Sequence, residues 1–273
     1  MRTVFAAVFA LATAVALAFL VLPVLAIFLR VPPGELLHAL DNDVTRDALL
    51  VSIKTSAIAH AAVLVFGTPT AYLLGRRRFR GRGLVVTLVE LPLVLPPAVA
   101  GIGLLAAFGR AGLLGDELDV LGMQIPFTQA AVVLAVAFVE SPFYVRGAIA
   151  AFEALDGSLL DAARTLGAPP ARVFFRVALP LAAGGLGAAS ALALARGLGE
   201  FGATIIFAGS LQGVTQTLPL AIYAQFEQDF DTALAISALF IVVGAVLLVA
   251  LKLIPWFRFA STSRSRFGIS TSS

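Results

Sequence analysis

The sequence contains no cysteine among its 273 residues. That absence excludes disulfide bonds, zinc sites built on thiolates and thiol-based catalysis. Lysine is also scarce: Lys54 and Lys252 are the only two, and they follow Ile53 and Leu251. A phosphate-binding loop needs a Gly-Lys-Ser/Thr sequence, so the chain cannot itself be a P-loop ATPase. Charge of either sign is low as well, because 13% of the residues are charged, against roughly 25% in soluble domains.

Apolar residues make up 60% of the chain and gather in long runs. A soluble fold of this size could not bury so much apolar surface, whereas a bilayer can accept it. The runs are long enough for membrane-spanning helices and lack the alternation of barrel strands. We therefore predict an all-α integral membrane protein with six transmembrane helices, at Val4–Leu29, Ala48–Leu74, Leu84–Phe108, Thr128–Ala151, Leu181–Phe207 and Thr232–Ile254.

Proline is expected to disturb two of these runs. Pro23 is expected to kink the first, and Pro92, Pro96 and Pro97 should bend or break the third near its start. The first run is too long for a signal-peptide core of about 7–15 residues, so we expect it to remain as an uncleaved span.

The loops between the predicted spans alternate in charge. Basic residues dominate the second loop, the fourth loop and the C-terminal tail, whereas acidic residues outnumber basic ones in the first, third and fifth loops. The positive-inside rule then places the basic loops and both termini in the cytoplasm. We expect one transmembrane domain over residues 1–260 and a disordered, Ser/Thr-rich cytoplasmic tail over residues 261–273.

The fourth loop, residues 153–180, carries the most local structure. A short amphipathic helix is predicted from Ser158 to Leu166, with Ser158 as its N-cap and Asp161 as an acidic capping partner. Gly167 suits the left-handed position that ends a helix, and a second short helix is expected over Ala171–Ala178. Geometry alone leaves two readings open, an ordinary ordered loop or a rigid functional knob. The apolar face of the first helix is predicted to hold Leu159, Ala162, Ala163 and Leu166.

The same loop resembles a known signature. Asp161-Ala162-Ala163, three residues, Gly167, nine residues and Val177-x-Leu179-Pro180 are similar to the EAA signature of permease subunits of binding-protein-dependent ABC importers. Asp161 replaces the signature's Glu and Val177 its Ile. The resemblance implies a six-helix importer permease fold whose cytoplasmic coupling loop sits in a groove of an ATPase subunit. It assigns that coupling role to Asp161, Ala162, Ala163, Gly167, Val177, Leu179 and Pro180.

The resemblance also implies the partners. They are a second copy of this chain in a homodimer, two copies of a cytoplasmic ATPase and an extracytoplasmic substrate-binding protein. ATP and Mg would be bound by the ATPase, so no cofactor is expected in this chain. The setting implied is the plasma membrane of a bacterium or archaeon, with membrane lipid around the helices and no nucleic acid as partner.

The fifth predicted span contains a charged pair and several glycines. Arg196 and Glu200 are four residues apart, so we expect them to meet on one helix face. One reading is a stripe lining a path or gate; the other is a buried ion pair that orients a helix at a subunit interface. The candidates for the path or gate are Pro96, Pro97, Arg196, Gly199, Glu200, Gly202 and Thr204.

Further strings narrow the family resemblance. Gly199-Glu-Phe-Gly-Ala-Thr204 and Thr215-Gln-Thr-Leu-Pro-Leu-Ala-Ile-Tyr223 look like molybdate and tungstate permeases, as do Leu91–Pro97 and Phe108–Gly115. The implied function is transport of molybdate or tungstate, with sulfate or thiosulfate as the alternative. A secondary transporter would be expected to show inverted repeats with paired broken helices, but one span alone contains such a break. An intramembrane enzyme is further removed, since no Ser–His or paired-Asp arrangement occurs in the spans.

A few other polar residues lie in or beside the spans. Glu90 and Arg146 are expected to snorkel to the cytoplasmic surface, and Lys54 to lie near the outer end of the second span. Glu140 should have an interhelical partner, because buried acids are usually paired. His60 is interpreted as a satisfied interior histidine, so no metal site is predicted.

Overall fold

The computed structural model describes residues 2–32, 34–35 and 41–253. This part of the chain is helical, with no strand. The predicted tail 261–273 and the end of the sixth predicted span lie outside the described residues, so the boundary of the transmembrane domain stays a prediction.

Five helices in the described part are long and apolar enough to cross a membrane. They are α1 (Arg2–Arg30), α3 (Asp43–Arg76), α7 (Gln129–Glu153), α13 (Phe230–Leu253) and a continuous helix over Pro170–Leu198. The last consists of α9 (Pro170–Val173), the π-helical turn η2 (Phe174–Ala178) and α10 (Leu179–Leu198). The fold class is as predicted, and these helices cover five of the six predicted spans.

The third predicted span is broken, as its prolines suggested. It consists of α4 (Arg82–Glu90), the 3-10 turn η1 (Leu91–Leu93) and α5 (Pro97–Phe108), and its two halves meet at 113°. The break falls in the middle of the predicted span rather than near its start. Pro96 has extended backbone angles (φ −54°, ψ 139°) at the N-cap of α5, where the ring prevents the helix from continuing.

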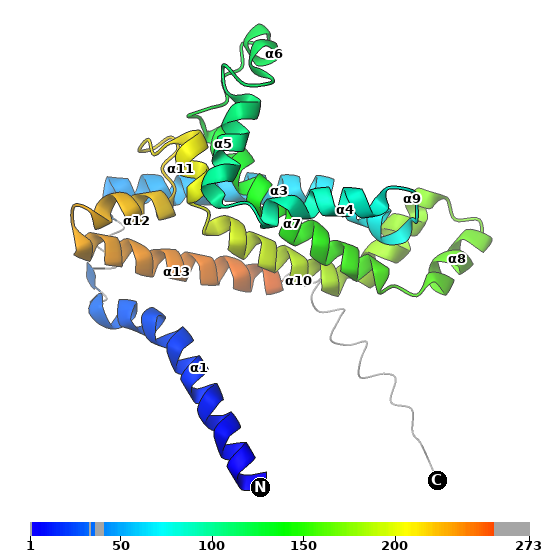
Figure 1. Ribbon diagram of the computed structural model, residues 1–273, viewed down its shortest axis with the longest axis horizontal. Coiled ribbons are helices and arrows are strands. Elements are labelled where there is room, and N and C mark those ends of the chain that lie inside the picture. Colours follow the sequence, from blue (N-terminus) through cyan, green and yellow to red (C-terminus); the bar gives the residue numbers. More distant parts are fainter. Residues whose placement is uncertain (1, 33, 36–40, 254–273) are drawn as a thin grey trace.

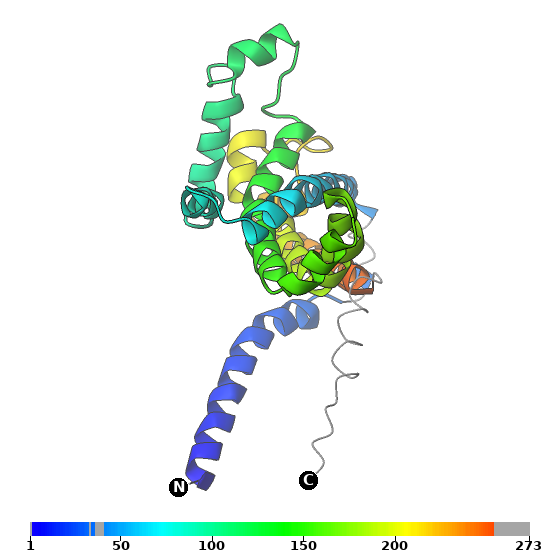
Figure 2. The ribbon, with the colours of Figure 1, turned by 90° about the vertical axis from the view of Figure 1, so that its right-hand side faces the viewer.

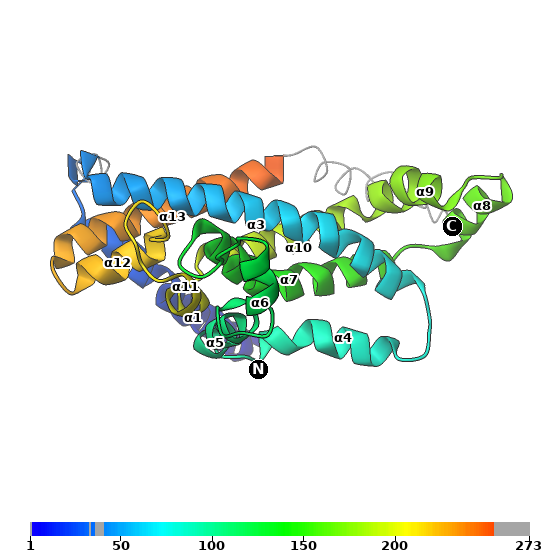
Figure 3. The same cartoon turned by 90° about the horizontal axis from the view of Figure 1, so that it is seen from above.

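The core of the molecule is formed by α3, α7 and α10, which run side by side (Figures 1 and 3). Small residues let α7 and α10 approach closely: a Cβ on Gly147 would lie 2.6 Å from that of Ala189, and one on Gly185 would lie 2.6 Å from that of Ala151. Such contacts replace the hydrophobic driving force that lipid does not supply.

Two ends of this bundle are structurally different. At one end lie α8 (Gly157–Thr165) and α9; at the other lies α12 (Leu218–Phe226), packed against α13 and α3 (Figure 3). A side unit projects from the bundle and contains α5, α6 (Gly115–Val120) and α11 (Gly202–Ala208) (Figures 1 and 2).

The helix α1 projects away from the rest of the molecule (Figure 2). Its contact with α13 involves Ile27, at its C-terminal end, and Val31, just beyond it. Between Val4 and Leu22 its side chains are exposed, so within a membrane they must be covered by lipid or by another subunit.

Candidate functional site

The predicted coupling loop forms a compact knob that begins at α8. Its N-cap is Asp156, whose carboxylate accepts a hydrogen bond of 2.9 Å from the Ser158 backbone N–H. That hydrogen bond holds the pKa of the Asp156 carboxyl below its ordinary value. The predicted cap at Ser158 is therefore wrong by two residues, because an Asp with extended backbone already precedes it.

Asp161 has a different contact from the one predicted. It does not cap α8 but accepts a hydrogen bond of 2.8 Å from Arg164 on the same exposed face. Two exposed side chains three residues apart on a helix contribute little to stability.

Gly167 ends α8 as predicted. Its φ is +83°, in the left-handed region, and the next amide, that of Ala168, donates to the Ala163 carbonyl at 3.1 Å. This pattern satisfies carbonyls that the end of the helix would leave unpaired. No atom would lie within 4 Å of a Cβ at Gly167, so the requirement for glycine is one of backbone conformation alone.

The apolar face of α8 is turned differently from the prediction. Leu160, which was not among the predicted four, is fully buried in the core, and Ala163 packs against the same core. Leu159 is 50% exposed and Leu166 is 89% exposed, and Ala162 is exposed as well. The knob therefore presents three apolar side chains outward at the end of the molecule.

The second short helix of the loop is not separate. It starts at Pro170, passes through the π-helical turn and continues directly into α10. Leu179 and Pro180 consequently belong to the first turn of α10, and Val177 packs against the core. The α9 part of the knob is thus continuous with α10, whereas α8 is joined to α9 by the non-helical residues 166–169.

The predicted pair Arg196–Glu200 exists, with 2.9 Å between Arg196 Nη1 and Glu200 Oε2. It does not lie on a single helix, because α10 ends at Leu198 and Gly199 is its C-cap. The expected span to Phe207 is wrong for this reason. Glu200 Oε1 accepts a hydrogen bond of 2.8 Å from the Ala203 amide, so the buried carboxylate also caps α11.

The two breaks in the chain face each other. A Cβ on Gly202 would lie 2.6 Å from that of Pro97, and one on Gly101 would lie 2.7 Å from that of Ile206. The structure thus brings Pro97 and Gly202 into contact, and both Pro96 and Pro97 remain exposed. Thr204 is fully buried, and its hydroxyl has no hydrogen-bond partner among the described residues.

A buried polar cluster connects the three central helices. His60 on α3 contacts the Glu140 carboxylate on α7 through Nδ1 and the Ser190 hydroxyl on α10 through Nε2, the latter at 2.8 Å. The interhelical partner expected for Glu140 and the satisfied state expected for His60 are confirmed. The His60–Ser190 contact corrects the expectation that the spans contain no Ser–His arrangement. Neither contact was predicted, because 80 residues separate His60 from Glu140 and 130 separate it from Ser190.

Glu140 also connects this cluster to the end of α10. Its Oε2 has no partner among the described residues, and a Cβ on Gly197 would lie 2.7 Å from that oxygen. Gly197 directly follows Arg196, so the cluster adjoins the break between α10 and α11.

Two further predictions concern charges near the membrane surfaces. Glu90 and Arg146 form an ion pair at 3.0 Å that was not predicted, and their snorkelling to the membrane surface stays a prediction. Lys54 Nζ donates a hydrogen bond of 2.8 Å to Gln129 Oε1. Within the described part, no group of three or more His, Asp or Glu side chains could hold a metal ion.

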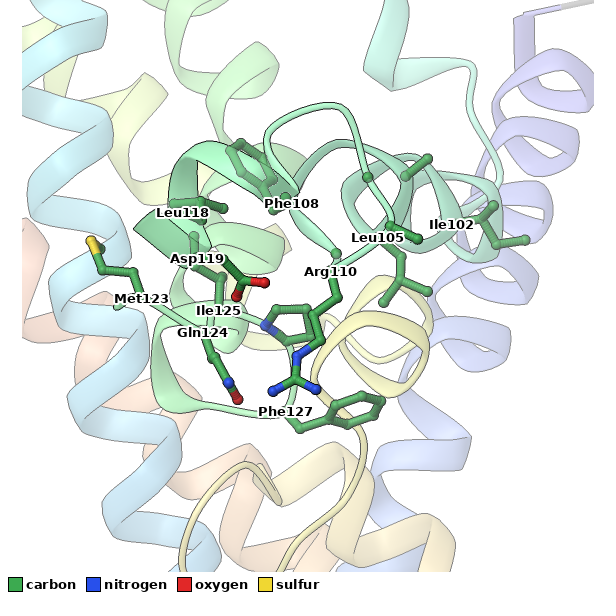
Figure 4. Close-up of a pocket in the computed structure, with 16 residues that line it drawn as sticks. Ile102, Leu105, Phe108, Arg110, Leu118, Asp119, Met123, Gln124, Ile125 and Phe127 are labelled. Atoms are coloured by element: carbon green, nitrogen blue, oxygen red, sulfur yellow. The ribbon is translucent and has the colours of Figure 1, made fainter. Parts of the chain in front are cut away.

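A cavity of about 650 Å³ lies within the side unit, between α5, α6 and the segment before α7. Figure 4 shows the Arg110 and Gln124 side chains reaching toward Phe127 in this cavity. Phe127 has φ +62°, a conformation that a bulky residue rarely adopts, and its ring lies against Gly209. None of the predicted path residues lines this cavity.

Comparison with known protein families shows which family this chain matches. Residues 67–258 match the family described as "Binding-protein-dependent transport system inner membrane component". The chain is 45% identical over 231 residues to the molybdenum transport system permease protein ModB of Mycobacterium tuberculosis, covering 85% of this chain and 88% of that protein. It is 41% identical over 222 residues to ModB of Escherichia coli K12, covering 81% and 96%.

Solved structures share the fold at low sequence identity. A chain of a bacterial alginate ABC transporter, in complex with an alginate-bound periplasmic protein, superposes with a TM-score of 0.73 at 15% identity. The match covers 93% of this chain and 94% of that one. The MetNI methionine transporter in an inward-facing conformation gives a TM-score of 0.56 at 19% identity, covering 80% and 94%.

Proposed function

The chain belongs to the family of binding-protein-dependent transport system inner membrane components, and on that premise we propose that it is the permease subunit of an ATP-driven importer of molybdate. One observation carries the substrate: the chain is 41–45% identical, over more than four-fifths of its length, to molybdenum transport permeases. Tungstate would use the same path, since it is a tetrahedral dianion of nearly the same size as molybdate, whereas sulfate is smaller. Sulfate and thiosulfate are the alternatives.

In this proposal the end of the molecule with α8 faces the cytoplasm and docks on an ATPase. Support comes from the exposed apolar side chains Leu159, Ala162 and Leu166 and from the basic loop at Arg76–Arg82. Two ATPase copies would bind the ATP and Mg, because this chain has no phosphate loop. Asp161, Ala163 and Gly167 would then hold the docking knob in shape, while Val177, Leu179 and Pro180 connect it to α10.

The translocation path would lie between two copies of the chain. The exposed side chains of α1 and the projecting side unit leave apolar surface that a second copy can cover. Closure of the ATPases would push both knobs together, and each push would reach the break at Arg196–Glu200 through the unbroken helix from Pro170 to Leu198. Such a two-state movement opens the path alternately to each side.

The chemistry of the break suits an anion that must pass without being trapped. Arg196 lies beside the break, but Glu200 neutralises it at 2.9 Å, and the Arg196 side chain is about one-third exposed. A path with a bare buried cation would hold a divalent oxyanion too tightly for release. High affinity would instead belong to an extracytoplasmic binding protein that docks at the α12 end.

The test is uptake into proteoliposomes that hold this chain with its ATPase, with binding protein outside and ATP inside. Labelled molybdate should accumulate only with ATP, and unlabelled tungstate should compete while sulfate does not. Competition by sulfate would mean that the chain is a sulfate permease, while the importer mechanism would still hold. No oxyanion uptake by an assembled complex with an active ATPase would remove the substrate assignment.

A further inference from the structure

Two cavities meet at the C-terminal end of α3, beside α9. One, of about 400 Å³, lies between the last turns of α3 and the segment from Arg164 to Val173. The other, of about 470 Å³, is bounded by Leu73, Arg77, Arg78 and Phe79. Leu73 and Arg77 line both, so the two form one depression, called here the basic groove. Figure 3 shows this end of α3 next to α9.

The rim of the basic groove is positively charged. Arg76, Arg77, Arg78 and Arg164 line it, and no acidic residue is among its lining residues. Two of these arginines are already engaged, since Arg76 donates to the Leu155 carbonyl at 3.1 Å and Arg164 to Asp161. Arg77 and Arg78 are exposed, and neither makes a side-chain hydrogen bond or ion pair within the described part of the chain. The groove therefore has guanidinium groups available for an anion.

The floor of the basic groove is apolar and continues into the membrane. Pro69, Tyr72, Leu73 and Val173 form it. Along α3 an exposed apolar stripe runs from Val65 and Phe66, which is 74% exposed, to Leu73, which is 45% exposed. Arg77 lies one turn beyond Leu73 on the same side of the helix. Apolar surface at membrane depth thus leads directly to an unpaired cation at its boundary.

From this arrangement we propose that the basic groove binds an anionic phospholipid of the cytoplasmic leaflet. Its phosphate would contact Arg77 and Arg78, and its acyl chains would cover the stripe of Val65, Phe66 and Leu73. An isolated phosphate or oxyanion has no use for the apolar floor. An acidic segment of a partner protein would not follow a stripe several residues long into the hydrocarbon layer. Basic pockets at the cytoplasmic ends of spans are where anionic headgroups are held.

The position of the groove gives the lipid a possible effect on transport. Its walls include Arg164 on α8 and Pro170 at the start of α9. A lipid in the groove therefore touches α3 and the docking knob at once, and it stiffens the junction through which the ATPase would act. This consequence rests on the proposed function, whereas lipid binding itself rests on the groove alone.

The test is native mass spectrometry of the full-length chain in detergent, titrated with dioleoylphosphatidylglycerol or dioleoylphosphatidylcholine. Arg77→Gln removes a rim cation; Arg80→Gln removes an equal charge from the same loop at a residue that lines neither cavity. We expect the wild-type chain to prefer the anionic lipid, and Arg77→Gln to weaken that binding about fivefold while Arg80→Gln leaves it unchanged. Leu73→Gln should weaken both lipids, because it makes the floor polar.

Three outcomes would overturn the proposal. Equal losses for Arg77→Gln and Arg80→Gln would mean diffuse attraction to a basic loop. Full competition by glycerophosphoglycerol or inorganic phosphate would mean a site for a free anion. Unchanged lipid binding, together with loss of ATPase association in Arg77→Gln, would assign the groove to the ATPase. Because binding is measured without transport, failure of molybdate uptake leaves this result interpretable.

Discussion

A fully buried carboxylate within a membrane-spanning helix is tolerated only where its surroundings replace the water it has lost. Glu140 finds that replacement in His60, and His60 in turn reaches Ser190, so one histidine ring joins three helices. The arrangement fixes the rotation of α3 and α10 about α7, because small changes in either helix would separate the ring from a partner. Buried polar groups of this kind specify one packing at some cost in stability.

The first prediction concerns this cluster. Glu140→Ala or His60→Ala alone should destabilise the purified protein by about 3–5 kcal/mol, because each leaves the other group buried without its partner. The double variant should lose less than the sum of the two. Thermal unfolding in detergent measures all three. Ser141→Ala is the control, since that hydroxyl bonds only to a carbonyl of its own helix; additive losses would show that the two residues act separately.

Gly167 allows a second prediction at this scale. Gly167→Ala should cost about 1–2 kcal/mol, because an L-residue resists φ +83° although the space is open. If the knob docks on an ATPase, co-purification with that subunit should decrease by about fivefold or more. Gly83→Ala is the matched control, since Gly83 also faces open space but lies in a regular helical turn. If the Gly167→Ala variant co-purified normally with the ATPase, the knob would not be part of the docking surface.

Among the elements, α5 and α11 approach each other about as closely as α7 and α10 do. Both helices are short, both follow a break in a longer apolar run, and they meet through Gly101 and Gly202 without space for a side chain. The ion pair Arg196–Glu200 lies at the start of α11 and ties this side unit to the end of α10. The side unit is therefore positioned by close glycine contacts and one carboxylate, together with an apolar core in which Leu104 of α5 and Phe207 of α11 pack with α7.

A prediction at this scale compares two glycines of α5. Gly101→Leu should force α5 away from α11, because its Cβ would lie 2.7 Å from that of Ile206; overpacking of this kind costs about 1–3 kcal/mol. Gly103→Leu adds the same side chain to the same helix in open space. ATP-driven uptake in proteoliposomes should decrease at least tenfold in the first variant and by less than half in the second. Equal activities would mean that this contact is dispensable.

The elements also show what the sequence could predict. Hydrophobic length located five spans and the prolines located the break, because both depend on residues next to one another. The end of α10 could not be found in this way, since apolar residues continue past Leu198 and no proline interrupts them. The helix stops there, and Glu200 instead accepts a hydrogen bond from the Ala203 amide in the first turn of α11.

In the coupling loop, too, features with a local sequence signal were predicted and features set by packing were not. Gly167 was located correctly, because a left-handed residue has a strong local signal. The buried face of α8 was not, since both Leu159 and Leu160 suit an apolar face and only the packed core selects Leu160. The roles that the family resemblance assigns to these residues remain predictions.

On the scale of the whole molecule, the loops lie at two opposite ends of the bundle, except for the segment with α6, which belongs to the side unit. The basic loop and the knob lie at one end, and the segment around Gln212 and Asp47 lies with α12 at the other. The helix α1 projects from the bundle, with exposed apolar side chains over most of its length.

Because the chain has no cysteine, single introduced cysteines can report which end of the molecule faces the cytoplasm. Arg78→Cys should react with a membrane-impermeant maleimide only in permeabilised cells, whereas Gln212→Cys, on an exposed loop at the opposite end, should react in intact cells. The cysteine-free parent chain is the control for background labelling. Reaction of Arg78→Cys from outside would reverse the orientation of every helix.

The π-helical turn at Phe174–Ala178 sets how α9 is rotated about the helix axis relative to α10. Such a turn contains one residue more than an α-helical path would use, and it stands between the docking knob and the remainder of α10. Deleting a single residue from it would restore a regular helix and rotate everything on one side by about 100° relative to the other. The rotational phase of α9 relative to Arg196 and the rest of α10 is thus set by one inserted residue.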